Sequence, residues 1–420
     1  MKPFYGLDFG TSNLSIAIQN GEGTQVLPID GQNKTMPTVL YFGPSGGEPI
    51  VGQSAMLRYV ADGMSGRFMQ SLKSVLPNSG FTGTYLDRLG FADIEDLIAY
   101  ILRDVRQRAN EQVGMDIDRA VFGRPAEFSK DPEEETMAIE RLMKAAKLAG
   151  FNEVELQLEP IAAAFHYEMS LDREEVVLVA DLGGGTTDFT VTRLSPKRRR
   201  KRDRSKDILS TGGVYIGGDK FDSAVMEMKL LKYFGQDAEY NSWEKWMRFP
   251  SYLVRGIMQW QEIAFLKDTR TMRVLNDLVR YARTKEDKEC AIRLLTLIDE
   301  NLGFSLFQTI ETAKRGLSTY DSDCIYFNQS AIKIVEPIFR NEFDEIIAFA
   351  LEEYEQCVDQ VLADAGVSNG RIDSVFLTGG SSLVPCVQSA FANRFGEDKL
   401  RRGDTFISVA SGLASSQLLS

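Results

Sequence analysis

Two glycine-rich segments, each opened by an aspartate, have residue types and spacing suited to binding the phosphates of a nucleotide. Asp8 to Asn13 reads DFGTSN and Asp181 to Asp188 reads DLGGGTTD, and each follows a short apolar segment of strand character. Consecutive glycine N–H groups can cradle a phosphate, because no Cβ atom intervenes. The leading carboxylates are the hard oxygen ligands that Mg²⁺ prefers. The two segments therefore predict a phosphate clamp that is neither a P-loop nor a dinucleotide fingerprint.

Two further glycine turns offer backbone N–H groups. Gly217-Gly218 precedes Phe221-Asp222, and the turn TGGSS at 378–382 follows a strand-like SVFLT and precedes a helix expected near Pro385. A helix N-terminus favours an anion or a sugar edge. Each turn alone is more typical of plain turn chemistry, so only the joint order of the four carries weight.

Other chemistries are poorly supported. His166 is the single histidine, and the four cysteines form no CxxC pair, which argues against two-histidine metal sites, a zinc ribbon and a disulfide framework. Residues 43–47 fit the GxSxG string of a serine hydrolase. They lie between strand-like TVLYF and EPIVG, however, and this pattern predicts a hairpin loop. The chemistry must then rest on carboxylates, lysine, threonine and a metal.

The elements that position these residues alternate between strand and helix. Residues 4–8 and 14–18 read as a hairpin, and 175–180 with 189–194 repeat the plan 173 residues later, which suggests a duplication. An apolar stripe after Asp93 and a capped start at Asp131-Pro132 predict helices between the two hairpins. The pattern predicts an α/β fold of two lobes with a cleft between them.

Composition fits a soluble protein. The 420 residues carry a net charge of −12, which opposes broad binding to nucleic acid or anionic membrane. No signal peptide or apolar span is evident, so we expect a cytoplasmic protein. The run PKRRRKRDRSKD at 196–207 contains eight basic residues. It is interpreted as a solvated hairpin loop, with a local contact to an acidic partner or nucleic acid through 197–206 left as an alternative.

In this order the motifs resemble a known family, the 70-kilodalton heat-shock chaperones, and specifically their nucleotide-binding domain. The chain carries DFGTSN, LEPIAAAFHY, DLGGGTTDFTV, GGDKFD, ETAKRGLS and LTGGSSLVP between residues 8 and 385. The resemblance implies the α/β, two-lobed actin-like ATPase fold of the actin, sugar-kinase and chaperone superfamily. In that fold, two ribonuclease H-like domains flank a central nucleotide cleft.

The resemblance also implies boundaries. Lobe I would span 1–171, with 38–117 as a subdomain insertion and 400–420 returning to it. Lobe II would span 172–399, with 219–335 as a mostly helical insertion. Because the sequence stops at Ser420, the peptide-binding domain is expected to be absent, as in stand-alone YegD-like members.

Site residues carry over by motif. The resemblance implies that Gly10, Thr11, Ser12 and Asn13 bind the β-phosphate side and Gly183, Gly184 and Gly185 the γ side, while Asp8 and Asp181 steady Mg²⁺. Thr186 would contact the γ-phosphate or the attacking water, and Asp188 and Glu159 would orient that water. The residues implied for catalysis are Lys73, Glu159, Asp181, Thr186 and Asp188, and the remaining nucleotide contacts are Gly217, Gly218, Gly379, Gly380 and Ser381. The residues themselves leave two alternatives: Lys73 as a surface lysine and Glu159 as a mere helix cap.

An adenosine-binding helix is implied by ETAKRGLS. Its residues Glu311, Lys314, Arg315 and Ser318 follow i, i+3, i+4, i+7 spacing, with the stem of Arg315 covering the base. The alternative is a solvated salt-bridge stripe. Two departures from the family pattern are Leu383, where it has a second arginine, and Phe406, where it has an acidic residue.

The expected function is a chaperone-type molecular switch that binds Mg-ATP, hydrolyses it slowly to ADP and phosphate, and acts on an unidentified protein partner or co-chaperone. A non-hydrolysing nucleotide sensor or an actin-like assembling protein is the alternative. A small-molecule kinase is a less favoured alternative.

Overall fold

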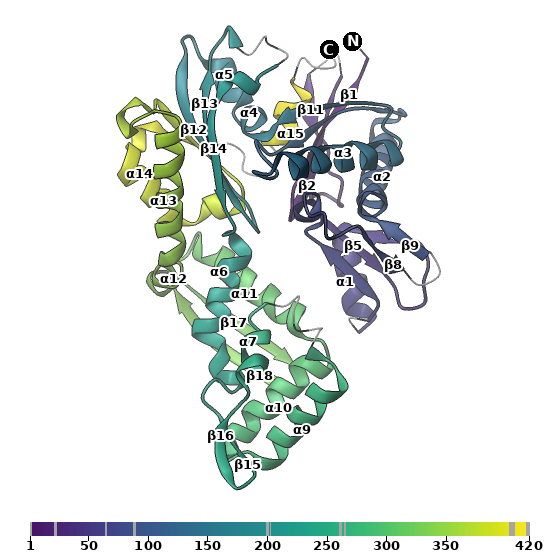
Figure 1. The fold of residues 1–420 in the computed structure, drawn as a ribbon, viewed down its shortest axis with the longest axis vertical. Coiled ribbons are helices and arrows are strands. Elements are labelled where there is room, and N and C mark those ends of the chain that lie inside the picture. Colours follow the sequence, from purple (N-terminus) through teal and green to yellow (C-terminus); the bar gives the residue numbers. More distant parts are fainter. Residues whose placement is uncertain are drawn as a thin grey trace. The chain divides into compact units, whose positions relative to one another are not determined.

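The structure is a computed structural model that describes residues 2–20, 23–63, 65–86, 90–198, 201, 203–259, 263, 266–402 and 408–416. The chain divides into two compact units (Figure 1). The first comprises Met1–Gly217 and Glu352–Ser420, and the second Gly218–Leu351. The lobe boundaries expected from the sequence stay a prediction.

Two sheets of the first unit share one strand order. The first runs β11 (Glu153–Leu158), β10 (Arg119–Arg124), β1 (Phe4–Phe9), β2 (Asn13–Gln19), β3 (Thr24–Val26), and β4 (Thr35–Pro37) also pairs with β2. The second runs β20 (Leu400–Arg402), β19 (Ser374–Thr378), β12 (Glu175–Leu182), β13 (Thr187–Leu194), β14 (Ile208–Val214). In both, an antiparallel hairpin lies beside parallel strands. The predicted duplication is confirmed.

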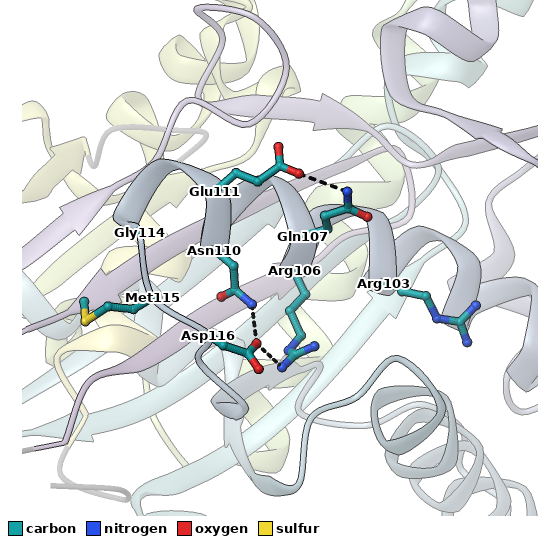
Figure 2. Close-up of a pocket in the computed structure, with 8 residues that line it drawn as sticks. All are labelled: Arg103, Arg106, Gln107, Asn110, Glu111, Gly114, Met115 and Asp116. Carbon is teal, nitrogen blue, oxygen red and sulfur yellow. Dashed lines mark hydrogen bonds and ion pairs between the residues drawn. The ribbon is translucent and has the colours of Figure 1, made fainter.

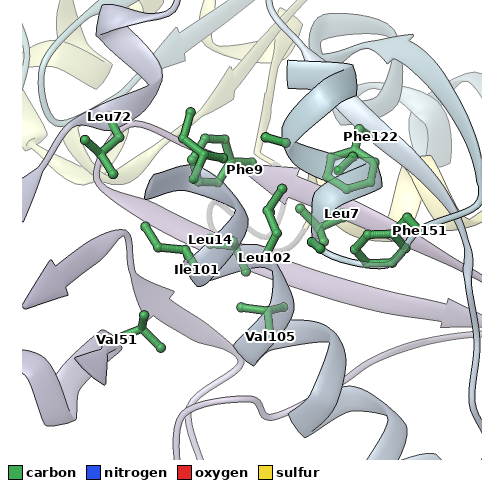
Figure 3. Close-up of a cluster of buried hydrophobic side chains, with 14 of the residues drawn as sticks. Leu7, Phe9, Leu14, Val51, Leu72, Ile101, Leu102, Val105, Phe122 and Phe151 are labelled. Atoms are coloured by element: carbon green, nitrogen blue, oxygen red, sulfur yellow. The ribbon is translucent and has the colours of Figure 1, made fainter. Parts of the chain in front are cut away.

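Successive residues of a strand point to opposite sides of the sheet, and both faces of the first sheet are covered. Leu7 and Phe9 join a core with Leu102 and Val105 of helix α2 (Ile94–Val113), as Figure 3 shows. Tyr5 and residues of helix α3 (Pro132–Leu148) belong to the same core. On the other face, α15 (Ser408–Ala414) packs on β1 and on α4 (Glu159–Ala163). The expected caps are present: the Asp131 carboxylate accepts from the N–H groups of Glu133 and Glu134, and the N–H of Asp93 donates to Asp96.

The insertion after the first hairpin is a small β-rich element. It contains β5 (Val39–Phe42), β6 (Ile50–Val51), α1 (Gly52–Ala61), β7 (Arg67–Gln70), the 3₁₀ turn η1 (Leu72–Val75), β8 (Gly83–Leu86) and β9 (Gly90–Asp93). Strands β5 and β6 pair antiparallel, so residues 43–47 form the expected hairpin loop. Leu72 is drawn in the core of Figure 3, and this anchors η1 to the first sheet.

Helices dominate the second unit. It comprises α6 (Gly218–Val225), a π-helical turn (Met226–Leu230), a 3₁₀ turn (Leu231–Phe234), a hairpin of β15 (Glu239–Ser242) and β16 (Lys245–Arg248), α7 (Ser251–Gly256), α9 (Thr269–Tyr281), α10 (Lys285–Asp299), α11 (Gly303–Leu317), a hairpin of β17 (Ser322–Gln329) and β18 (Ile332–Phe339), and α12 (Arg340–Ile346).

The chain returns to the first unit along α13 (Ala348–Asp364). The 3₁₀ turn η8 (Gly380–Leu383) and then helix α14 (Pro385–Phe395) come later in the chain. The start of α14 at Pro385 confirms the helix expected after TGGSS. Another helix of the first unit, α5 (Phe165–Ser170), follows α4. Among the described residues, no helix is both long and apolar enough to cross a membrane.

Gly6 allows the return of α15 onto β1. A Cβ atom at Gly6 would lie 2.2 Å from the backbone nitrogen of Ala414 and 2.5 Å from the carbonyl oxygen of Ala410. We expect Gly6→Ala to destabilise the protein by about 1–3 kcal/mol or more, because helix backbone must move. Thermal unfolding measures this. Gly370→Ala is the control, since its Cβ would meet nothing within 4 Å, and equal melting temperatures for the two variants would refute the packing argument.

Candidate functional site

The first glycine segment is the loop of the β1–β2 hairpin. Asp8 pairs across the hairpin with Ser15, so its carboxylate is fixed at the strand end. A Cβ at Gly10 would lie 2.3 Å from the carbonyl oxygen of Asn13, and the tight loop therefore requires glycine. The carbonyl oxygen of Ser12 accepts a hydrogen bond of 2.9 Å from the N–H of Thr38.

The second segment is the corresponding loop of the β12–β13 hairpin. The N–H of Gly183 donates to the carbonyl of Thr186 at 2.9 Å, which closes the turn. Asp181 lies directly opposite Asp188 in the ladder, a like-charged pair that is unfavourable unless something compensates it. The side chain of Thr186 acts on Asp188 so as to lower the pKa of its carboxyl.

The glycine turns of the first unit converge. A Cβ at Gly185 would lie 3.7 Å from Cγ2 of Thr11, so the two hairpin loops approach each other. A Cβ at Gly217 would lie 2.4 Å from the carbonyl oxygen of Gly184. One at Gly379, whose φ is +80°, would lie 2.3 Å from that of Leu182. The Ser381 hydroxyl donates to the carbonyl of Gly183 at 3.0 Å. Three separate segments, at Thr11, at Gly217 and at 379–381, are thus gathered around the second loop.

A buried ion pair belongs to the same region. Nζ of Lys73 lies 2.6 Å from Oε1 of Glu159, and both residues are at most 9% exposed. Ser71, with φ of +57°, precedes the turn η1 that carries Lys73. Gly123 on β10 gives Glu159 its room, since a Cβ there would lie 2.9 Å from Cγ of Glu159. Lys73 is therefore not a surface lysine, and the Glu159 carboxylate binds a lysine in addition to opening α4.

Burial and mutual repulsion oppose ionisation of the carboxylates. Burial raises the pKa of Asp181 to about 6, and the charge of Glu159 adds to the rise while Lys73 opposes it. Burial raises the pKa of Asp188 to about 7, reinforced by Asp181 and Glu159. The pKa of Asp8 is raised for the same reasons. Burial works to lower the pKa of Lys73, but the charges of Glu159, Asp8 and Asp181 outweigh it and raise that pKa.

These residues fit a bound cation and nucleotide phosphates. Four carboxylates, those of Glu159, Asp8, Asp181 and Asp188, interact electrostatically with Lys73. A cation beside Asp8 and Asp181 would favour their ionised forms. The converging turns leave no space for side chains at Gly10, Gly217 and Gly379, as expected where backbone must approach phosphate oxygens. Within the described residues, no group of three or more His, Cys, Asp or Glu side chains is arranged to hold a metal ion by itself.

The predicted adenosine helix is α11 of the second unit, and its residues point in different directions. Lys314 donates to the carboxylate of Asp222 at 2.9 Å and to the carbonyl of Gly218 at 3.0 Å. Arg315 pairs with Glu311 at 2.9 Å and is 74% exposed. Ser318 lies one residue past the end of the helix. The salt-bridge alternative thus describes Glu311 and Arg315, whereas Lys314 is half-buried against α6, of which Gly218 is the first residue.

Leu383 closes η8 and is 43% exposed. Phe406, the other departure noted in the sequence, lies outside the described residues.

The solvated-loop interpretation of the basic run is wrong for two of its arginines. Arg204 is only 3% exposed and binds Glu168 through both terminal nitrogens, at 2.8 and 2.9 Å. It also pairs with Asp207. Arg198 pairs with Glu174 at 2.8 Å and with Asp207. A buried guanidinium needs such carboxylate partners. Asp207 ends the run itself, whereas Glu168 and Glu174 lie outside it. Residues 199, 200 and 202 lie outside the described part of the chain.

A pocket lies elsewhere, along the second half of α2 (Figure 2). None of the eight residues that line it is a predicted site residue. Most of its polar side chains bind one another: Asp116 accepts from Arg106 and from Asn110, and Glu111 accepts from Gln107. Arg103 donates to the carbonyl of Leu148. Because these groups are already satisfied, we assign it no ligand.

Comparison with known families decides the ancestry of this fold. A family model described as Hsp70 protein matches residues 86–247 and 276–417, well over half of the chain. The chain belongs to the Hsp70 protein family. The two-lobed actin-like ATPase fold expected from the motifs is thereby confirmed, and the chain contains a chaperone-type ATP-binding domain. Members of the Hsp70 family bind ATP and ADP with Mg²⁺ and are generally ATPases.

The matched segments cover the second hairpin, α6, α11 and the turn at 379–381. The first hairpin and Lys73 precede them, so their assignment rests on DFGTSN and on the geometry described above. The motifs did not indicate that Asp222 holds Lys314, although it stands in GGDKFD. They also gave no sign that Ser381 bonds Gly183, because the two residues are 198 positions apart.

Removing the Lys73 charge should destabilise the nucleotide-free protein. Lys73→Met leaves Glu159 buried without its partner, and breaking a buried pair in this way typically costs about 3–5 kcal/mol. Thermal or denaturant unfolding measures the loss. Lys144→Met is the matched control, because Lys144 lies 3.3 Å from Glu95 but is 55% exposed, and such a pair contributes about 1 kcal/mol at most. Equal stabilities of the two variants would contradict the buried-pair assignment.

Proposed function

We propose that this Hsp70 family member hydrolyses Mg-ATP slowly and works as a nucleotide-dependent molecular switch. The observation that carries the proposal is the Lys73–Glu159 pair, buried at 2.6 Å beside two facing glycine loops. Loops of this kind bind phosphate, and a fixed lysine beside them stabilises charge on a transferred phosphoryl group. Phosphate binding and charge stabilisation are the two requirements of phosphoryl transfer.

Phosphate binding falls to the two loops. Gly10 to Asn13 would hold the β-phosphate side and Gly183 to Gly185 the γ side. The approach of Gly185 to Thr11 supports a single phosphate chain held between them. Gly217, Gly379, Gly380 and Ser381 would support the second loop from behind.

Catalysis falls to the charged residues. Lys73, held by Glu159, would face the developing negative charge as a point charge. Asp188 would orient the attacking water and accept its proton, with Thr186 placed to contact the same water or the γ-phosphate. Glu159 would share the water-orienting role as far as its bond to Lys73 allows. When bound, Mg²⁺ would neutralise phosphate charge, and Asp8 and Asp181 would hold it largely through its water shell.

The adenosine would be bound by α11 of the second unit. The Lys314–Asp222 ion pair would fix the helix relative to α6. The exposed Arg315, which pairs with Glu311, would leave its methylene stem available to cover the base. Gly218 and Ser318, at the ends of these helices, would complete the contacts. The readout of the switch would be an unidentified protein partner.

Phosphate release from Mg-ATP, run beside calorimetric ATP and ADP binding, tests the proposal. We expect slow release that Lys73→Ala and Thr186→Ala each reduce by about 10²-fold or more, the scale typical of a lost electrostatic contact, while nucleotide binding survives. Lys144→Ala is the control and should match wild type. Binding without release would favour a sensor or an assembling protein. Release that only an added sugar stimulates would favour a kinase, and either outcome would reject the ATPase switch.

A further inference from the structure

A cluster of three buried polar groups lies directly behind the second phosphate loop. The hydroxyl of Thr187 donates to the carbonyl oxygen of Ile216 at 2.8 Å, and the hydroxyl of Tyr354 donates to the same carbonyl at 3.3 Å. The two hydroxyl oxygens are 3.1 Å apart. A carbonyl oxygen has two lone pairs and can accept both bonds. The cluster joins β13, the turn before α6 and helix α13.

Tyr354 is held rigidly. It is 2% exposed, and its ring packs edge-on against Phe189 at 5.8 Å. Helix α13 approaches β14 so closely that a Cβ at Gly212 would lie 2.7 Å from Val361, and the Ser210 hydroxyl donates to the Val361 carbonyl at 2.6 Å. Burial raises the pKa of Tyr354 to about 12, so its hydroxyl keeps its proton at physiological pH. The group is a fixed, neutral donor.

The three residues lie close in sequence either to the proposed catalytic residues or to the points where the chain passes between the two units. Thr187 stands between Thr186 and Asp188. Ile216 precedes Gly217, whose close approach to Gly184 fixes the back of the loop. The chain passes from the first unit to the second after Gly217 and returns before Glu352, two residues ahead of Tyr354. The Tyr354 hydroxyl thus bonds Ile216, just before the chain leaves the first unit. Tyr354 itself lies on α13, the helix along which the chain returns.

We infer that Tyr354 is a positioning residue. Through Ile216 and Thr187 it fixes the register between the turn that leads into the second unit and the loop that carries Thr186 and Asp188. The inference rests on the proposed ATPase function and adds a residue that none of the catalytic motifs contains. Its consequence is that the water-orienting groups stay in place only while the turn at Ile216 is held, which couples this turn to hydrolysis.

An ordinary buried hydrogen bond would give the same contacts, so the test compares two tyrosines. Tyr354→Phe removes the hydroxyl and keeps the ring. Tyr41→Phe is the matched control. Tyr41 is fully buried on β5, and its hydroxyl donates to Asp62 at 2.9 Å and to the carbonyl of Ser65 at 2.7 Å. Both variants should lose similar stability, because each loses a buried hydroxyl with two partners.

Only Tyr354→Phe should alter the chemistry. We expect single-turnover hydrolysis at saturating Mg-ATP to fall by between about 3-fold and 100-fold, since small misplacements of reacting groups are costly. The ATP dissociation constant should change by less than about 2-fold, because the binding loops keep their backbone contacts. Thr187→Val should behave like Tyr354→Phe, and Thr187→Ser, which keeps a hydroxyl, should recover activity. Hydrolysis by Tyr354→Phe equal to that of Tyr41→Phe would overturn the inference.

Amide hydrogen exchange without nucleotide separates this inference from the proposed function. Tyr354→Phe should speed exchange in both 183–188 and 214–217, and Tyr41→Phe in neither. If wild type releases no phosphate, the proposed ATPase function fails, and exchange alone then decides whether the register is held. Unchanged exchange in Tyr354→Phe would overturn the inference whatever the hydrolysis data show.

Discussion

Repulsion among carboxylates is the constraint on which the first unit depends. Asp8, Asp181 and Asp188 sit close enough to one another and to Glu159 that burial and charge raise the pKa of each aspartate. Left mobile, such side chains would swing apart into water. They are held because the three aspartates belong to hydrogen-bonded hairpins and Glu159 opens a helix. The fold therefore supplies a cluster of carboxylates whose ionised forms are favoured within the protein chiefly by Lys73 and would be favoured further by a bound cation.

The glycines serve this constraint through space. Gly217 and Gly379 touch the backbone of the second loop, and Gly123 makes room for the carboxylate of Glu159. Each is distant in sequence from the atoms it approaches. A side chain at any of them would push the charged groups or the loops apart by an ångström or more, and placement on that scale decides catalytic efficiency. These glycines allow close packing. A left-handed backbone conformation is required only where φ is positive, as at Gly379.

What could be predicted from the sequence was largely local. Alternating apolar residues predicted both hairpins, and caps such as Asp131 predicted helix starts, because each signal lies within a few residues. The pairing of Lys73 with Glu159 spans 86 residues, and only the family resemblance pointed to these two positions. The basic run misled because Arg204 finds Glu168 on α5, 36 residues away. Likewise, helical spacing placed Lys314 and Arg315 on one face, whereas Asp222 draws Lys314 against α6.

The two duplicated hairpins share one plan, but their glycine loops are not equivalent. In the first hairpin Asp8 faces Ser15, a small buried hydroxyl, whereas in the second Asp181 faces Asp188. Both hairpins therefore provide a carboxylate at the strand end and a glycine-containing loop, which the proposed function assigns to phosphate binding. Only the second adds an opposing carboxylate, and only its loop is followed by a threonine, Thr187, bonded to the turn at Ile216. Under the proposed function, the shared plan would account for phosphate binding by both loops, and the divergence at these positions would place the chemistry beside the second loop. A nucleotide held as proposed would have its β-phosphate at the first hairpin and would be hydrolysed from the side of the second hairpin.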